Sequence, residues 1–188
     1  MPEAWDRRMD RLRGTGVNII FIFVRNQRTN MKILMVCLGN ICRSPMAEGI
    51  LRRKIAENDL DWKVDSAGTE RDHIGEPPHP FSLKVARRHG IDISGQRARR
   101  FMPGDLEKFD KIYAMAPDVI REMQHLAGQR TPLEKVDLLL NEPYPGQDLP
   151  VPDPWYGGED GFEKAYDLIE EACDRIIEKY GVKAEAKR

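Results

Sequence analysis

Short apolar runs alternate with amphipathic segments along the chain from Met31 onward. The apolar runs are typical of buried parallel strands, and we expect strands at residues 32–36, 111–115 and 136–140. Residues 62–66 alternate apolar and polar side chains instead, which also predicts a strand. Between and after them, apolar residues recur every three or four positions, which is typical of one helix face. We expect these helices at residues 44–58, 81–89, 117–126 and 162–180. Strands that alternate with helices predict an α/β domain with a parallel sheet.

The segment after the first predicted strand is the expected ligand site, because ligands of such sheets lie beyond the carboxyl ends of the strands. Ser44 and Pro45 are typical of a helix start, with Ser44 as N-cap and Pro45 as the first helical residue. A second segment, residues 141–161, is a long loop rich in Pro and Gly. Loops of that length are often functional.

Residues 1–30 differ from the rest of the chain. Their apolar run, residues 17–24, is far shorter than the roughly 20 residues that span a bilayer. Arg25 follows that run in place of the small residues of a signal-peptide cleavage site. We therefore expect residues 1–30 to be an extension that is disordered, forms an extra strand or results from a start upstream of Met31. Residues 31–188 would form the folded domain.

Composition excludes several classes of protein. The 188 residues suit one ordinary domain. The 30 basic and 31 acidic residues give a net charge of −1, so no overall field attracts nucleic acid or an anionic membrane. Three cysteines are too few for a disulfide framework and indicate free thiols in a reducing compartment. We expect a cytoplasmic protein that binds neither nucleic acid nor membranes.

The sequence CLGNICRS, which starts at Cys37, has the residues of a phosphate cradle. Successive backbone amides in a tight loop form a nest for an anion, and the following helix directs its positive end to the same place. Both favour a phosphate dianion and a thiolate at Cys37. Arg43 can bind two phosphate oxygens with its planar guanidinium, and Ser44 can donate to the Cys37 sulfur. The pattern predicts in-line attack of Cys37 on phosphorus.

Asp153 in the long loop is the candidate proton donor. Expulsion of an alkoxide or phenoxide from phosphorus needs a general acid, and the loop contains Asp153 before Pro, Trp155, Tyr156 and Gly. The two aromatic residues could flank an aromatic leaving group. Asp-Pro and Tyr-Gly-Gly are also turn sequences, but the Cys37 loop favours the catalytic interpretation.

Six motifs together resemble the low-molecular-weight protein tyrosine phosphatases. They are VCLGNICRSPMAEG (36–49), VDSAGT (64–69), IGEPPHP (74–80), RRHGI (87–91), FDKIYAM (109–115) and DPWYG (153–157). The resemblance implies a three-layer α/β/α fold with a four-stranded parallel sheet and a phosphate-binding loop after the first strand. It also implies a two-step mechanism through a phosphocysteine, without metal or other cofactor, and a phosphotyrosine-containing protein or peptide as substrate.

The resemblance also assigns roles to individual residues. Cys37 matches the nucleophile, Arg43 the phosphate-binding arginine and Asp153 the general acid. Phosphate and substrate binding are expected from Leu38, Gly39, Asn40, Ile41, Cys42, Ser44, Trp155 and Tyr156, and support of the loop from Ser66 and Gln96. Cys42 matches a thiol that can form a reversible disulfide with the nucleophile, which would protect it from irreversible oxidation.

Three positions depart from the family pattern. Asp72 stands where relatives commonly have an aromatic wall of the phosphotyrosine slot, and an acid there would repel acidic peptides. Gln96 replaces a histidine that hydrogen-bonds the loop network, although an amide can also donate and accept. Ala116 stands where many relatives have Asp. These departures concern substrate preference and rate rather than reaction type.

Several alternatives share the fold or the loop. An arsenate reductase would need further cysteines for its redox relay, and Cys173 lies on the apolar face of the last predicted helix. Phosphoarginine phosphatases tend to have Thr where this chain has Ile41. A weakly catalytic phosphate-binding signalling module is the third alternative. The four histidines lack metal-ligand spacing with the cysteines, so we expect no metal. The protein is expected to be a monomer or a weak dimer.

Overall fold

The computed structural model describes residues 30–181, so the extension expected at residues 1–30 lies outside them except for Asn30. Four parallel strands form one sheet in the order β2-β1-β3-β4. The strands are β1 (Lys32–Cys37), β2 (Lys63–Gly68), β3 (Lys111–Ala114) and β4 (Val136–Leu138). The expected parallel four-stranded sheet is therefore confirmed.

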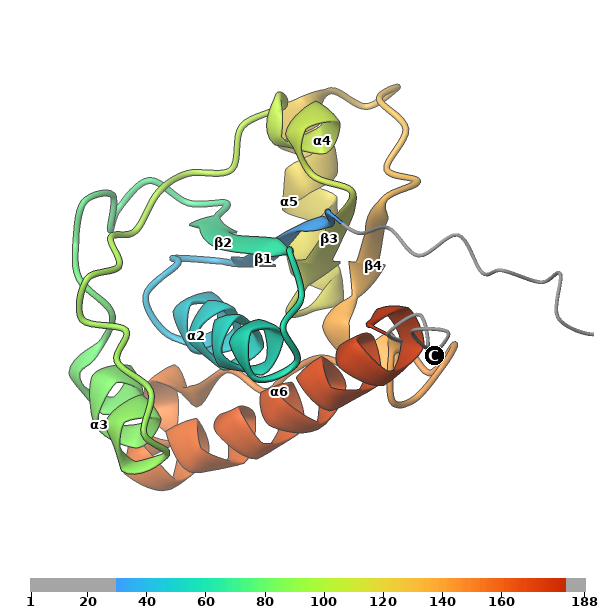
Figure 1. Cartoon of the computed structure of the whole chain (residues 1–188). Coiled ribbons are helices and arrows are strands. Elements are labelled where there is room, and N and C mark those ends of the chain that lie inside the picture. Colours follow the sequence, from blue (N-terminus) through green and yellow to red (C-terminus); the bar gives the residue numbers. More distant parts are fainter. Residues whose placement is uncertain (1–29, 182–188) are drawn as a thin grey trace, which may run out of the picture.

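Helices cover both faces of the sheet. Helices α2 (Arg43–Glu57) and α6 (Gly158–Tyr180) pack on one face, and α5 (Pro117–Ala127) packs on the other (Figure 1). Helix α3 (Pro80–Arg88) lies beside the start of α6. The short helix α4 (Asp105–Lys108) was not predicted, because four residues are too few to show a helical period.

The central position of β1 explains why the first predicted strand is a continuous apolar run and does not alternate with polar residues. Ile33 and Met35 point into the core formed with α2, α3 and α6. Leu34 and Val36 point into a second core formed with α5. All four side chains are fully buried. A central strand that is covered on both faces needs apolar residues at every position.

Several predicted boundaries were wrong. β2 extends to Gly68 instead of ending at residue 66, and β4 ends at Leu138 because the next residues form η3. Two helix starts also differ. Helix α2 begins at Arg43 with Cys42 as N-cap, and no side chain caps it. Ser44, predicted as the cap, lies inside the first turn, where its Oγ is 3.0 Å from the Cys37 sulfur. Helix α6 begins at Gly158, four residues before the first residue of the predicted apolar stripe. Its first turn contains no apolar side chain, so the apolar period did not mark it.

The chain reaches the carboxyl edge of the sheet from two directions. One segment is the loop between β1 and α2. The other connects β4 to α6 and contains the 3-10 helices η3 (Leu139–Asn141) and η4 (Pro154–Tyr156). Within residues 30–181, no helix is both long and apolar enough to cross a membrane. The same residues contain no group of three or more His, Cys, Asp or Glu side chains placed to hold a metal ion.

Candidate active site

The loop from Cys37 to Arg43, which we call the phosphate loop, curls tightly at the end of β1. Asn40 has a φ of 56°, a left-handed conformation that Asn tolerates better than most residues. The end of β2 approaches so closely that a Cβ on Gly68 would lie 2.6 Å from the Leu38 oxygen. Only glycine fits at this position, which explains the glycine in the VDSAGT motif.

Backbone hydrogen bonds fix the orientation of the first peptide units of this loop. The amides of Thr69 and Glu70 donate to the carbonyl oxygens of Cys37 and Leu38, at 3.1 and 3.0 Å. In a planar trans peptide the N–H points opposite to the C=O. The amides of Leu38 and Gly39 therefore point toward the inside of the loop, as an anion nest requires.

Two donors surround the Cys37 sulfur. The backbone amide of Asn40 lies 3.2 Å from it, and Ser44 Oγ lies 3.0 Å from it. Ser44 Oγ also accepts a hydrogen bond from Asn40 Nδ2 at 2.9 Å. The single hydroxyl proton of Ser44 can point at the sulfur or at the Ala67 carbonyl oxygen, which is farther away at 3.4 Å. The arrangement stabilises a thiolate at Cys37.

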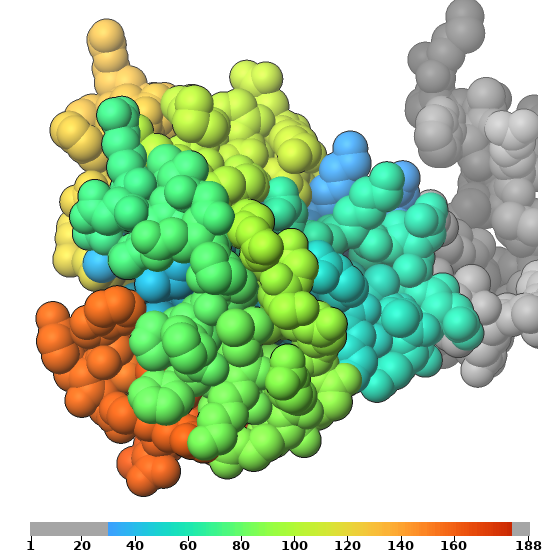
Figure 2. Space-filling view, turned by 90° about the vertical axis from the view of Figure 1, so that its left-hand side faces the viewer, coloured from blue at the N-terminus to red at the C-terminus, as the bar shows by residue number. Residues whose placement is uncertain are grey.

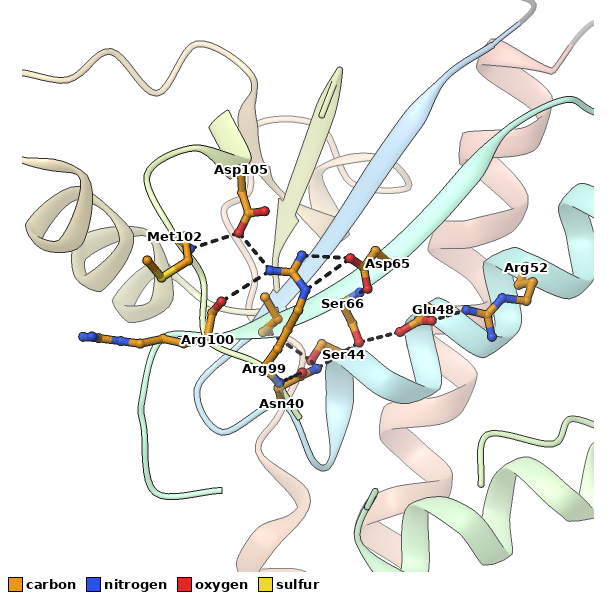
Figure 3. Close-up of polar contacts among 11 residues, drawn as sticks. Asn40, Ser44, Glu48, Arg52, Asp65, Ser66, Arg99, Arg100, Met102 and Asp105 are labelled. Atoms are coloured by element: carbon orange, nitrogen blue, oxygen red, sulfur yellow. Dashed lines mark hydrogen bonds and ion pairs between the residues drawn. The ribbon is translucent and has the colours of Figure 1, made fainter. Parts of the chain in front are cut away.

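A set of hydrogen bonds from Ser66 and Glu48 supports Asn40 (Figure 3). Asn40 Nδ2 also donates to Ser66 Oγ at 2.9 Å, and Ser66 Oγ donates to Glu48 Oε2 at 2.5 Å. Arg52 forms an ion pair with the other oxygen of Glu48. Burial raises the pKa of Glu48, while the Ser66 hydroxyl and the Arg52 charge act in the opposite direction. Glu48 was not predicted to belong to the site.

Arg99 holds Asn40 from the other side. Its backbone amide donates to Asn40 Oδ1 at 2.9 Å, which fixes the amide group of Asn40 in one orientation. The guanidinium of Arg99 lies between Asp65 and Asp105, at 2.9 and 3.0 Å from their carboxylate oxygens (Figure 3). Both halves of the Asn40 side chain thus have fixed partners, and the left-handed backbone conformation is held in place.

Arg43 connects the phosphate loop with the loop between η3 and η4. Its Nη1 donates to the Val151 carbonyl at 3.1 Å, and its Nη2 lies 2.8 Å from Asp153 Oδ2. The Arg43 side chain is nearly buried, whereas 46% of the Asp153 side chain is exposed. Arg43 Nε is buried and has no hydrogen-bond partner within residues 30–181. A buried guanidinium donor without a partner suits an oxyanion ligand.

These groups surround a pocket of about 240 Å³. In Figure 2 the blue segment that follows β1 lies at the bottom of a hollow, between the green segment after β2 and the orange segment around η4. The lining residues are Cys37, Leu38, Gly39, Ile41, Cys42, Arg43, Glu70, His73, Asp153, Trp155 and Tyr156. Nucleophile, arginine and acid candidates thus share one pocket.

The other predicted site residues lie in the pocket wall, behind the phosphate loop or, for Gln96, beside α2. Trp155 and Tyr156 line the pocket. Asn40, Ser44 and Ser66 are buried behind it and position the loop.

Gln96 does not belong to the hydrogen-bonded set of Asn40, Ser66 and Glu48. Its Nε2 donates to the Pro45 carbonyl at 3.2 Å. Its Oε1 is buried without a partner within residues 30–181. Gln96 therefore contacts the first turn of α2 rather than the loop itself.

Asp72 was expected to form part of the pocket wall, but the structure places its neighbour there. Asp72 is exposed and does not line the pocket, whereas its neighbour His73 does. The ring centroids of His73 and Trp155 are 6.1 Å apart. Glu70 is a second lining residue that the sequence did not reveal. Both follow the VDSAGT motif by a few residues, but nothing in their local pattern distinguishes them from an ordinary surface loop.

The other two thiols have different surroundings from Cys37. Cys42 is buried, and burial together with the neighbouring Cys37 raises its pKa to about 12. Cys173 is fully buried in α6, as predicted, and burial raises its pKa as well. Both are free thiols in this structure.

Comparison with known proteins agrees with this geometry. Residues 32–187 match the model of the low molecular weight phosphotyrosine protein phosphatase family. The chain is 40% identical over 149 residues to YfkJ of Bacillus subtilis, which is named a low molecular weight protein-tyrosine-phosphatase. The aligned residues cover 78% of this chain and 94% of YfkJ. It is 35% identical to the human low molecular weight phosphotyrosine protein phosphatase, over 81% of this chain and 98% of that one.

Solved structures show the same fold. The crystal structure of YfkJ superposes with a TM-score of 0.73, covering 79% of this chain and 93% of that chain. A Drosophila arginine phosphatase superposes with a TM-score of 0.74 at 35% identity, covering 82% of this chain and all of that one. With its family match, its fold and its relatives in agreement, the chain belongs to the low molecular weight phosphotyrosine protein phosphatases.

Proposed function

We propose that the protein hydrolyses phosphotyrosine in proteins or peptides, and small aryl phosphates, through a phosphocysteine at Cys37. The observation that carries this proposal is the shared pocket: it joins the Cys37 sulfur, the Arg43 guanidinium and the Asp153 carboxyl group at the end of β1. A nucleophile, an anion receptor and a proton donor are the three groups that a phosphoric monoester needs for cleavage.

In the first step the loop amides and Arg43 bind the phosphate oxygens. The Cys37 thiolate forms a bond to phosphorus while the bond to the tyrosine oxygen breaks, and Asp153 gives its proton to that oxygen. The Arg43–Asp153 ion pair at 2.8 Å places the acid beside the bound phosphate. A phosphate that takes over the Arg43 guanidinium would release the Asp153 carboxylate, which takes up a proton from solvent and then faces the leaving group.

In the second step a water molecule forms a bond to phosphorus and the phosphorus–sulfur bond breaks. Asp153, now a carboxylate, accepts a proton from the water. The Cys37 thiolate leaves, and the hydroxyl of Ser44 at 3.0 Å and the Asn40 amide at 3.2 Å stabilise its charge. The same hydrogen bonds therefore lower the barrier of both steps.

The aromatic side chains at the mouth support a tyrosine substrate. His73, Trp155 and Tyr156 line the pocket and provide flat surfaces for a phenyl ring. Phosphoarginine is the second candidate, since one structural neighbour is described as an arginine phosphatase. Ile41 lines the pocket of this chain where phosphoarginine phosphatases tend to have Thr. An apolar side chain there offers no hydrogen bond to a guanidinium and supports the ester substrate.

The remaining proposals concern context. Residues 31–188 form the catalytic domain, which acts without a cofactor on phosphotyrosine proteins in the cytoplasm as a monomer or weak dimer. The three free thiols support a reducing compartment. Cys42 lines the same pocket as Cys37, which supports its role as the partner in a reversible protective disulfide.

Hydrolysis of p-nitrophenyl phosphate, phosphotyrosine and phosphoarginine by wild type and Cys37→Ser tests the proposal. We expect the wild type to hydrolyse the first two and the variant to hydrolyse none. Lack of activity in fully reduced wild-type protein would refute a phosphatase. Preference for phosphoarginine would replace the substrate while leaving the mechanism in place.

A further inference from the structure

The second half of the phosphate loop is held by a different element from the first half. The carbonyls of Cys37 and Leu38 accept from the backbone after β2. Farther along the loop, the Ile41 carbonyl accepts from the backbone amide of His79, at 2.8 Å. His79 is the N-cap of α3. The start of α3 therefore continues the set of donors that begins after β2.

Ser82, in the first turn of α3, adds a side-chain donor to this set. Its Oγ lies 3.3 Å from the Ile41 carbonyl oxygen and 3.2 Å from the Cys42 carbonyl oxygen. The residue is fully buried, so water cannot take over these contacts if the hydroxyl is removed. Its single proton is shared between two adjacent carbonyls of the phosphate loop.

Peptide geometry connects these carbonyls with the anion site. The Ile41 carbonyl belongs to the same planar unit as the Cys42 amide, and the Cys42 carbonyl to the same unit as the Arg43 amide. A donor that holds the two carbonyls on the outside of the loop directs both amides toward its inside. These two N–H groups are the ones nearest the Arg43 side chain and the N-terminus of α2, where an anion is most stable.

We propose that Ser82 is a positioning residue of the phosphatase site, which holds the amides of Cys42 and Arg43 in the orientation that binds the substrate's phosphate. This inference rests on the proposed function, because it assigns the phosphate to the phosphate loop. Ser82 itself does not line the pocket. It acts through the loop carbonyls, and α3 thereby becomes a structural part of the anion site.

Phosphate affinity of Ser82→Ala, measured directly by calorimetric titration with inorganic phosphate, tests the inference. Loss of a buried hydrogen bond to the loop predicts roughly tenfold weaker binding than in wild type. Turnover of phenyl phosphate and p-nitrophenyl phosphate should fall by the same factor at subsaturating substrate, because the proton transfer to the leaving group is unchanged.

Val85→Ala is the matched control, because Val85 is also fully buried in α3 but packs into the apolar core. It should lower the melting temperature at least as much as Ser82→Ala and leave phosphate affinity unchanged. Equal phosphate affinity in wild type and Ser82→Ala would overturn the role of Ser82, as would an equal loss in Val85→Ala. Wild type that binds no phosphate would instead overturn the proposed function.

Discussion

The floor and the rim of the pocket are held in different ways. We call the pocket floor Cys37, which lines the pocket, together with the four residues behind it: Asn40, Ser44, Ser66 and Glu48. All five are buried and form a continuous set of hydrogen bonds. The pocket rim consists of Glu70, His73, Asp153, Trp155 and Tyr156. Tyr156 is 94% exposed and Trp155 48% exposed.

This difference indicates a division of tasks. In the floor, the Asn40 amide has partners on both its nitrogen and its oxygen, so the geometry around the sulfur is fixed before substrate arrives. Such preorganisation stabilises the transition state of every phosphoric monoester alike. In the proposed function, the rim faces the leaving group, which differs between substrates. Changes in the floor should therefore reduce all activities, and changes in the rim should reduce them selectively.

Asp153→Ala should give the largest effect in the rim, because the general acid and base is lost. Turnover of phosphotyrosine should fall by roughly 10²- to 10⁴-fold. The first step with p-nitrophenyl phosphate should suffer less, because p-nitrophenolate leaves without protonation. Steady-state and burst kinetics with both substrates measure this. Asp160→Ala, an exposed carboxylate at the start of α6, is the control, and an equal loss there would remove Asp153 from its role.

Asn40→Ala tests the prediction that a change in the pocket floor reduces the activity toward all substrates equally. The substitution removes the partners of Ser44, Ser66 and the Arg99 amide, at a cost of about 2 kcal/mol or roughly 30-fold in kcat/KM. The loss should be the same for phosphotyrosine and p-nitrophenyl phosphate. Asn58→Ala is the control, since Asn58 bonds to the backbone at the far end of α2. A loss that depended on the leaving group would break the proposed division.

The contacts that could be predicted from the sequence are local, and those that could not are distant along the chain. Cys37, Arg43 and Asp153 lie in short motifs whose residue types suggest their chemistry. Arg99 reaches Asn40 across 59 positions, and no local pattern marks such a contact. Glu48 did leave a signal, because it lies four residues after Ser44 and four before Arg52. It is a buried acid in a helix with an apolar face, and buried acids need partners.

In the fold too, local sequence patterns predicted local features but not the effects of contacts between distant residues. All four strands were predicted: β1 from an apolar run that is covered on both faces, and the edge strand β2 from alternating apolar and polar residues. The prediction of Ser44 as a helix cap was wrong, since its hydroxyl contacts the Cys37 sulfur instead of a backbone amide. Capping preference is a local tendency, and a tertiary contact overrides it here.

Trp155→Ala should produce a smaller, selective effect in the rim. The loss of one aromatic wall is worth about 1 kcal/mol, or roughly fivefold in kcat/KM for phosphotyrosine. An alkyl phosphate, which has no ring to stack, should show no loss. Leu149→Ala, also exposed and in the same loop, should leave both substrates unaffected. An equal loss for aryl and alkyl phosphates would assign Trp155 to the floor instead.

The smallest expected effect is a difference between the rates at which iodoacetamide alkylates Cys37 and Cys42 in the same protein. Burial and the neighbouring Cys37 raise the pKa of Cys42 to about 12, so it stays a neutral thiol at neutral pH. Its labelling should be slow and should increase with pH without a plateau below that value. Cys37 should react first and be protected by inorganic phosphate. Labelling of Cys42 as fast as Cys37 at neutral pH would contradict the difference.

The central claim is that the phosphoryl group passes through the Cys37 sulfur. Rapid acid quench of the enzyme with p-nitrophenyl phosphate, followed by peptide mass spectrometry, tests it most directly. The account predicts one added phosphoryl group on the peptide that contains Cys37, with more of it in Asp153→Ala because the second step lacks its base. Turnover without any phosphoryl group on that peptide, or with undiminished labelling in Cys37→Ser, would contradict it.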